Sequence, residues 1–291
     1  MNDNVIEIKN LKKYYGTIKG VEDVSMKLKN GEAYGFIGPN GAGKSTTIKT
    51  LMGLINPTSG TIMINDKFVD KNDLELKEMI GYLSGEISLY DDLTVKEMLD
   101  FHESFYKKNI NPRRKELVNL LKLDESKKVE DLSLGNLKKL GIVLALMHEP
   151  KILILDEPTS GLDPIMQNVF YELLLDEKKK GTTILYSTHI LSEVSKICDK
   201  IGIIKDGTII KEIPIGDIIN NNMTYLTIDS ENINEIKNEL DLKIIMENNN
   251  TIKFINNLYP NEIINKISKY NINKLLIEEV PIEELFIEYY K

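Results

Sequence analysis

The chain has 291 residues, a formal net charge of −8 and a sequence pI of about 5.2. The length suffices for one α/β domain and a small second one, and the acidic balance argues against binding a nucleic-acid backbone, which needs a basic surface. The single cysteine, Cys198, excludes an internal disulfide and suits the cytosol. The first residues are polar and mixed in charge, unlike a signal peptide. We expect no membrane-spanning segment, because no apolar run approaches the ~20 residues required.

The N-terminal part alternates between apolar and polar residues over 6–29, which predicts antiparallel strands with a turn near Gly16. A short buried strand is predicted over 33–37, and a helix over 45–54 that Gly53 and Pro57 bring to an end. Between strand and helix lies an octet that fits the phosphate-binding pattern G-x-x-x-x-G-K-[ST]: Gly38, Pro39, Asn40, Gly41, Ala42, Gly43, Lys44 and Ser45.

This octet predicts a nucleotide site, because its glycines let backbone N–H groups turn toward phosphates at a helix N-terminus. Lys44 would reach the β- and γ-phosphates, the Ser45 hydroxyl would hold Mg²⁺, and Thr46 could bond a further phosphate oxygen. A chance glycine-rich turn is the alternative, and the strand and helix around the octet argue against it. The octet alone does not distinguish kinases, GTPases and motor ATPases.

Residues 87–140 are predicted to be mostly helical. Thr94 followed by Glu97 forms a capping-box pattern at a helix start, and Asn111-Pro112 breaks the stretch and begins another helix. The periodicity does not exclude an ordinary helical insertion.

An apolar strand over 151–155 ends in two carboxylates, Asp156 and Glu157. Such a run is typical of a parallel strand covered on both faces, whose carboxyl end is where doubly wound sheets place ligands. Asp156 could hold Mg²⁺ through water, and Glu157 could orient and deprotonate an attacking water. Two solvated acids in a turn would be the alternative without the phosphate-binding octet.

Four further motifs complete the pattern. They are Leu132-Ser133-Leu134-Gly135-Asn136 before the acidic strand, Ser160-Gly161-Leu162-Asp163 after it, His189 at the end of the apolar run 183–186, and Tyr15 ahead of Gly16. Taken singly, each has a plain structural explanation: Ser133 could simply cap a helix, His189 could end a strand, and Tyr15 could be a surface aromatic.

In this order the motifs resemble the ATP-binding subunit of an ATP-binding cassette (ABC) transporter, over about residues 4–215. The resemblance implies an ATPase with Glu157 as base and His189 on the γ-phosphate. It also implies Tyr15 stacked on adenine, Ser133 and Gly135 contacting the γ-phosphate across a dimer, and Asp163 linking the two sites.

The chain departs from the usual family pattern at two places. Leu134 and Asn136 replace a glycine and a glutamine of the signature, and this Ser-Leu-Gly form resembles ABC-2-type exporters of drugs and antimicrobial peptides. Gly85 stands where the family usually has a glutamine that helps to hold Mg²⁺ and links the site to the membrane subunit. Glu86 is adjacent and could substitute for it.

The C-terminal region, about 221–291, carries no chemical motif. Its order is strand 225–228, helix 233–240, strand 243–247, strand 251–255, helix 260–270 and strand 274–279, with a last helix over 282–290. The βαββαβ order suggests a ferredoxin-like unit, and the ending over 281–286 resembles that of many ABC-2-type ATPase subunits. We expect it to support packing or dimerisation rather than to sense a ligand.

We therefore expect a P-loop α/β cassette over 1–219, with an antiparallel β subdomain and a helical subdomain at about 87–140, and an α+β domain over 220–291. The expected function is hydrolysis of Mg·ATP at the interface of a homodimer or of a dimer with a paralogous ATPase subunit. It would drive transport, with export preferred, through a separate multi-span membrane permease, at the cytoplasmic face of the cell membrane. A soluble ABC ATPase and a weakly hydrolysing regulatory subunit are the alternatives.

Overall fold

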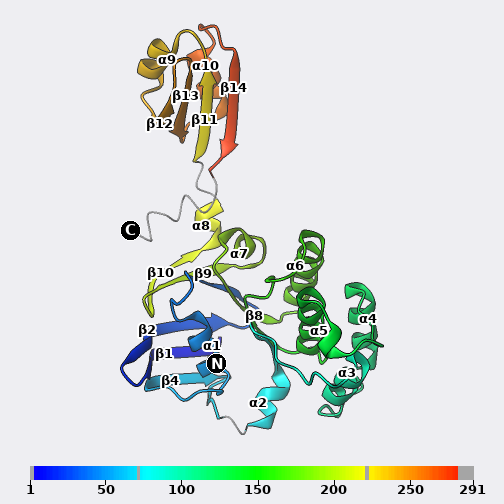
Figure 1. The fold of residues 1–291 in the computed structure, drawn as a ribbon. Helices are drawn as coiled ribbons and strands as arrows, with labels where there is room; N and C mark the ends of the chain where they lie inside the picture. The colour runs from blue at the N-terminus through cyan, green and yellow to red at the C-terminus, as the bar shows by residue number, and fades with distance from the viewer. Residues whose placement is uncertain (1–2, 71–72, 220–222, 281–291) are drawn as a thin grey trace. The chain divides into compact units, whose positions relative to one another are not determined.

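A computed structural model describes residues 3–70, 73–219 and 223–280. Its contacts divide the chain into two compact units, residues 1–215 and 216–291. Figure 1 shows the fold of each unit.

The first unit is built on a sheet that, in the described residues, has ten strands in the order β5-β4-β1-β2-β10-β9-β3-β8-β7-β6. Strands β6, β7, β8, β3 and β9 run parallel. The strands are β1 (Asn4–Tyr15), β2 (Ile18–Lys29), β3 (Ala33–Ile37), β4 (Ser59–Ile64), β5 (Lys67–Phe68), β6 (Ile80–Leu83), β7 (Ile152–Asp156), β8 (Thr183–Thr188), β9 (Lys200–Lys205) and β10 (Thr208–Pro214).

Every residue of β3, β7 and β8 is buried, as expected for parallel strands covered on both faces. The parallel arrangement brings the carboxyl ends of β3, β7 and β8 to the same edge of the sheet, where the loops that follow them meet. By contrast, β1 and β2 pair in antiparallel fashion through the predicted turn, in which Gly16 has a φ of 62°.

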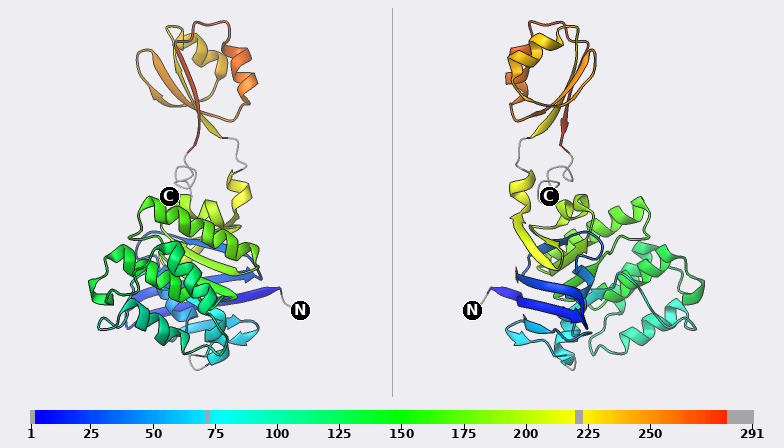
Figure 2. Two further views of the ribbon diagram at one scale, coloured as in Figure 1. Left: turned by 90° about the vertical axis from the view of Figure 1, so that its right-hand side faces the viewer. Right: turned by 60° about the vertical axis from the view of Figure 1, so that its left-hand side comes forward.

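The helices of the first unit include the predicted helical segment, which runs on to Leu146 rather than ending at 140. Figure 2 shows α3, α4 and α5 grouped together to one side of the strands. The helices are α1 (Lys44–Leu51), α2 (Leu74–Met79), α3 (Val95–Glu103), α4 (Asn111–Leu121), the 3-10 turn η1 (Val129–Asp131), α5 (Leu134–Leu146), α6 (Pro164–Lys179) and α7 (Leu191–Ile197). Helix α8 (Ile215–Ile219) begins at the last residue of the first unit and belongs otherwise to the second.

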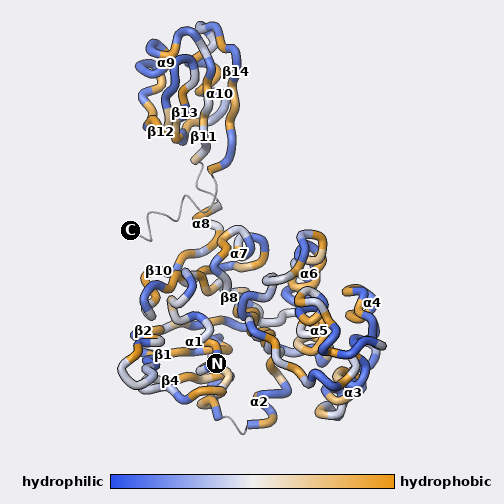
Figure 3. Tube along the Cα trace, in the orientation of Figure 1, coloured by the Kyte–Doolittle hydropathy of each residue, from blue (hydrophilic) through white to orange (hydrophobic). Residues whose placement is uncertain are grey.

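Capping chemistry explains where several of these helices begin. Thr94 and Glu97 form the predicted capping box at α3, and α4 starts with Pro112 in its first turn. Helix α1 ends at Leu51, three residues before the predicted end. Figure 3 colours the chain by hydropathy; in α5 the polar residues lie in the first half, and the second half, 140–146, is apolar and buried.

The second unit is an antiparallel sheet with the strand order β12-β13-β11-β14 in the described residues. Its elements are β11 (Thr224–Asp229), α9 (Ile233–Leu240), β12 (Lys243–Glu247), β13 (Thr251–Asn256), α10 (Pro260–Ile267) and β14 (Lys274–Glu279). The helices and the sheet share a core that includes Ile228, Ile236, Phe254 and Ile263. The predicted last helix, 282–290, lies outside the described residues.

None of the helices within the described ranges is both long and apolar enough to cross a bilayer.

Candidate nucleotide-binding site

The loop between β3 and α1 requires glycine at specific positions. Gly41 and Gly43 have φ values of 81° and 105°, in a region that favours glycine. At Gly43 a Cβ atom would also lie 2.7 Å from the carbonyl oxygen of Gly20. The octet therefore has a backbone conformation that other residues would strain, at the N-terminus of a helix where an anion is favoured.

Lys44 is almost fully buried at the start of α1, with 5% of its side chain exposed. Its Nζ donates hydrogen bonds to the carbonyl oxygens of Gly38 at 2.7 Å and Pro39 at 3.2 Å. It also lies 3.5 Å from Oε1 of Glu157. The loop thus holds a positive charge in front of the acidic strand, where phosphate oxygens could become further acceptors for it.

The acidic strand β7 ends as the sequence predicted. Asp156 is buried, and its Oδ1 accepts a 3.0 Å hydrogen bond from the hydroxyl of Ser187 on β8. Glu157 follows with a φ of 46°, a left-handed conformation that is uncommon for residues other than glycine. Its backbone N–H donates to the carbonyl of Ser187 at 3.0 Å, which ties this turn to β8.

His189 joins this group from the end of β8. Its Nδ1 lies 2.9 Å from Oε2 of Glu157, while Oε1 of the same carboxylate faces Lys44. The imidazole is half exposed, so it is accessible to a bound phosphate. Three predicted site residues, from three separate elements, therefore form one continuous series of contacts: Lys44, Glu157 and His189.

Ser45 and Asp156 supply the oxygen donors that a hard cation prefers. Ser45 is exposed in the first turn of α1, and Asp156 presents a carboxylate at the strand end. Mg²⁺ is held through one or two such protein oxygens together with substrate phosphates and water, so a serine hydroxyl and a carboxylate beside a phosphate loop fit it. Thr46, half-buried beside Ser45, is next along the helix.

Tyr15 lies at the end of β1, close to the phosphate loop. Its ring is 47% exposed, and Nζ of Lys13 lies 5.0 Å from the ring centroid. A Cβ atom at Gly20 would lie 3.0 Å from the Tyr15 ring and 3.2 Å from the Thr46 methyl group. Gly20, which belongs to no sequence motif, therefore allows the aromatic ring to approach the start of α1.

The predicted signature residues lie in a different place, against the loop after β7. Ser133 is the N-cap of α5, and its hydroxyl accepts from the N–H of Asn136 at 3.4 Å. A Cβ atom at Gly135 would lie 2.9 Å from the carbonyl oxygen of Gly161. Leu134 covers Gly161 as well and leaves 67% of its surface exposed.

Asp163 caps α6, since its carboxylate accepts from the N–H of Met166 at 2.9 Å. Ser133 and Asp163 therefore both have capping roles within this chain. Both residues are exposed, so they could also contact a ligand or a partner.

Two buried residues near the site were missed. Lys138 on α5 donates to the carbonyl oxygens of Ser84, Gly85 and Glu157, at 3.4, 3.3 and 3.2 Å. Burial lowers the pKa of Lys138, while the nearby carboxylates of Asp156 and Glu157 oppose that shift. No sequence motif includes Lys138, so no pattern pointed to it.

The second is Glu193 on α7, a buried carboxylate that gathers three hydroxyl donors. It accepts from Thr159 at 2.6 Å, Thr188 at 2.8 Å and Tyr186 at 3.2 Å. These hydroxyls flank Glu157 and His189 along the chain, so Glu193 fixes the two loops that carry those residues. Its position four residues after His189 was the feature of the sequence that could have pointed to it.

Gly85 is half-buried beside the acidic strand. A Cβ atom there would lie 3.5 Å from Oδ2 of Asp156, an ordinary contact distance. Glu86 is exposed.

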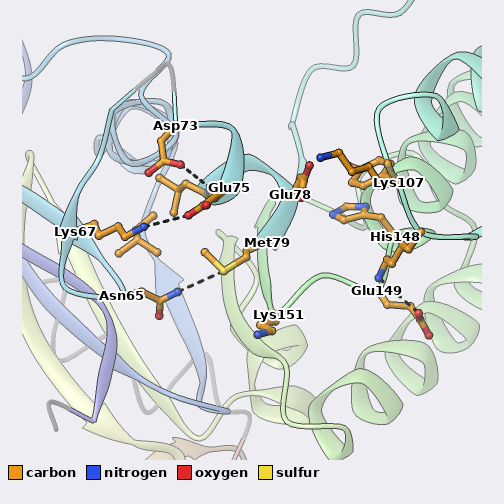
Figure 4. Close-up of a pocket in the computed structure, with 14 residues that line it drawn as sticks. Asn65, Lys67, Asp73, Glu75, Glu78, Met79, Lys107, His148, Glu149 and Lys151 are labelled. Carbon is orange, nitrogen blue, oxygen red and sulfur yellow. Dashed lines mark hydrogen bonds and ion pairs between the residues drawn. The ribbon is translucent and has the colours of Figure 1, made fainter.

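A pocket of about 650 Å³ lies elsewhere in the first unit, near the start of β6 and β7 rather than at their carboxyl ends (Figure 4). Its lining mixes charges: Lys67 points to Glu75, and Lys107 and Lys151 are nearby. His148 also lines it, and burial lowers its pKa to about 4. The residues that line this pocket do not include any of the phosphate loop.

Comparison with known proteins agrees with this geometry. Residues 21–160 match the family described as ABC transporter. The chain is 41% identical to the bacitracin transport ATP-binding protein BcrA of Bacillus licheniformis, over 76% of this chain and 74% of the relative. It is 41% identical to the lantibiotic transport ATP-binding protein SrtF of Streptococcus pyogenes, over 72% and 90%. It is 32% identical to the linearmycin resistance ATP-binding protein LnrL of Bacillus subtilis, over 97% of each.

Solved structures show the same likeness. The ATP-binding subunit of an ABC transporter superposes with a TM-score of 0.69 at 33% identity, over 74% of this chain and 91% of the other. A dimeric ATP-binding cassette in a post-hydrolysis state, bound to ADP and Pi, gives a TM-score of 0.66 at 26% identity, over 72% and 98%.

Proposed function

The chain belongs to the ABC transporter family of ATP-binding proteins and is an ATPase, and we propose that it drives export of an antimicrobial compound through a separate membrane subunit. The observation that carries the proposal is the contact series from Lys44 through Glu157 to His189 at the carboxyl ends of β3, β7 and β8. A lysine ammonium group, a carboxylate and an imidazole lie next to one another there, which supports the roles that we assign to them below.

The hydrolysis step follows from these positions. Lys44 and the loop N–H groups bind the β- and γ-phosphates, and Tyr15 stacks on the base. Glu157 accepts a hydrogen bond from the attacking water and takes its proton, while His189, held by the same carboxylate, contacts the γ-phosphate. Mg²⁺, bound through Ser45 and Asp156, would neutralise charge on the phosphates.

We propose that a second copy of the chain completes each site. Ser133 and Gly135 lie at the N-terminus of α5, which favours an anion, and they pack against Gly161 rather than against the phosphate loop of their own chain. Leu134 and Ile165, 67% and 73% exposed, flank this region with apolar surface. Asp163 would face the partner across the same interface. The dimeric cassette bound to ADP and Pi supports this arrangement, and a paralogous subunit would supply the same groups.

The membrane subunit would dock on the helical subdomain. Three exposed aromatic residues, which we call the aromatic ridge, lie on α3 and near it: Tyr90, Phe101 and Phe105. Their rings stack edge to face, with centroids 5.6 and 4.9 Å apart. Exposed aromatic clusters of this kind are typical of protein interfaces. The chain would then sit peripherally on the inner face of the cell membrane.

The names of three relatives support the substrate class that we propose. The names of these relatives refer to bacitracin transport, lantibiotic transport and linearmycin resistance. We propose a peptide or other antimicrobial compound as the substrate.

We also propose that the chain consists of a cassette over residues 1–219 and a ferredoxin-like domain over 220–291. The β-α-β-β-α-β order and the antiparallel pairing of the second unit support the ferredoxin-like domain, for which we propose a packing or dimer-supporting role.

The test is to purify the tagged chain in mild detergent from its native membranes and to identify what accompanies it. A multi-span membrane protein in near-stoichiometric amount is expected, and a Phe101→Asp/Phe105→Asp variant should lose it while keeping the ATPase activity of the isolated chain. Phe68→Asp, at an exposed aromatic on β5, is the matched control and should retain it. Recovery with ribosomes or nucleic acid instead would favour a soluble ABC ATPase.

A further inference from the structure

A buried lysine that the hydrolysis step does not use lies directly behind the catalytic carboxylate. Lys138 is on α5, the helix that Ser133 caps, and only 2% of its surface is exposed. A buried ammonium group must be matched by acceptors, and three carbonyl oxygens supply them. A charged side chain therefore occupies this buried position, where an apolar one would be usual.

One of these acceptors belongs to a residue in a costly conformation. Glu157 has a φ of 46°, and such left-handed backbone persists where surrounding contacts over-determine it. Its carbonyl accepts from Nζ of Lys138 at 3.2 Å and from the N–H of Ser160 at 3.3 Å, while its own N–H is held by Ser187. Lys138 thus helps to hold the peptide that aims the Glu157 carboxylate at Lys44 and His189.

The other two acceptors connect the site to a different part of the chain. Ser84 and Gly85 lie directly after β6, where the chain leaves the nucleotide core for the helical subdomain. Gly85 itself has no side chain that could reach the site. The ammonium group of Lys138 joins this segment, the catalytic residue and α5 at one point.

We propose that Lys138 is a positioning residue for hydrolysis, which locks the backbone of Glu157 to residues 84–85 and to the helix that carries the signature. Lys138 thereby connects the segment after β6 to Glu157, which Gly85 cannot do because it has no side chain. This inference rests on Glu157 being the base, as proposed above. It predicts an effect on the chemical step and not on nucleotide binding.

The experiment is steady-state Mg-ATP hydrolysis by the full-length chain and its Lys138→Met variant. Met keeps the volume of the buried side chain and removes the donor. We expect kcat to fall about 10- to 100-fold, the worth of a charge-assisted hydrogen bond, with KM for ATP within about threefold of the parent, because Lys44 and the phosphate loop are untouched. Lys115→Met, at an exposed position on α4, should leave both constants unchanged.

Two results would overturn the proposal: a kcat within twofold of the parent, or a loss that appears in KM alone. If Lys138→Met fails to fold, Lys138→Gln decides by the same division between kcat and KM, since its amide still donates but carries no charge. We expect an intermediate loss of kcat from it, and a parental kcat would be contrary. Glu157→Gln, measured in parallel, tests the base separately, so failure of that assignment is distinguishable.

Discussion

The two halves of the nucleotide site are built in opposite ways. The half around the phosphate loop is assembled within one chain: Lys44 and Asp156 are buried, and Glu157 bridges Lys44 and His189. The half around the signature is exposed, with Leu134 standing out from α5. The difference is what we expect if the assembled half binds ATP within one chain and, as we propose, the exposed half contacts the ATP bound by a partner.

The largest effect is expected from removing the base in the assembled half. Glu157→Gln keeps the shape of the side chain but removes its ability to take a proton, so turnover should fall by about 10²–10⁴ while ATP still binds. Turnover and equilibrium binding of labelled ATP are measured on the same preparation. Glu172→Gln on the exposed face of α6 is the control; near-parental turnover of Glu157→Gln would remove it from the role of base.

The second effect concerns ATP affinity in the same half. Lys44→Ala removes the charge that the loop holds for the phosphates, and we expect ATP affinity to fall about 10- to 100-fold, as for a lost charge-assisted hydrogen bond. Lys49→Ala, on the exposed face of the same helix, should bind as the parent does. Unchanged affinity in Lys44→Ala would count against the phosphate-loop assignment.

The exposed half should respond differently. Ser133→Asp keeps an N-cap for α5 but places a negative charge where the partner's γ-phosphate is expected. We predict that turnover falls by about tenfold or more while ATP affinity of the isolated chain is unchanged. Ser133→Asn, a neutral cap, is the control for helix stability, which thermal unfolding follows; if Ser133→Asp hydrolyses ATP normally, the signature half plays no part.

The smallest effect is expected at Gly85. Because a Cβ atom there would make only ordinary contacts with Asp156, Gly85→Gln should fold normally and change turnover by no more than a few fold. Thermal unfolding and Mg²⁺-dependent ATPase activity check this. A loss of folding or of all activity would show that the segment after β6 has no room for the side chain.

The sequence patterns of the assembled half are local: an eight-residue loop, an apolar strand and the acids that end it. In the structure Nζ of Lys44 lies 3.5 Å from Oε1 of Glu157, which directly follows Asp156 at the end of β7. The strand over 274–279 was also correct in its bounds. The roles of all the predicted site residues, in both halves, stay predictions.

Contacts between distant segments could not be predicted. Lys138 reads as an ordinary polar residue of a helix, because its carbonyl partners at Ser84 and Gly85 lie more than fifty positions earlier. Gly20 belongs to no motif either. Glycine is required there only because the Tyr15 ring packs close to α1 in the folded chain, which leaves little room for a side chain. Residues 87–140 were predicted to be mostly helical, and α5 continues that segment to Leu146.

The central claim is that two exposed signature halves close over ATP held by two assembled halves. Its most direct test is light scattering of the Glu157→Gln variant, which should hold ATP without consuming it. We predict about twice the 33.2 kDa mass of the chain with Mg-ATP, and the single-chain mass with ADP or when Ser133→Asp is added. A single-chain mass with Mg-ATP, or a dimer that Ser133→Asp does not disturb, would contradict the account.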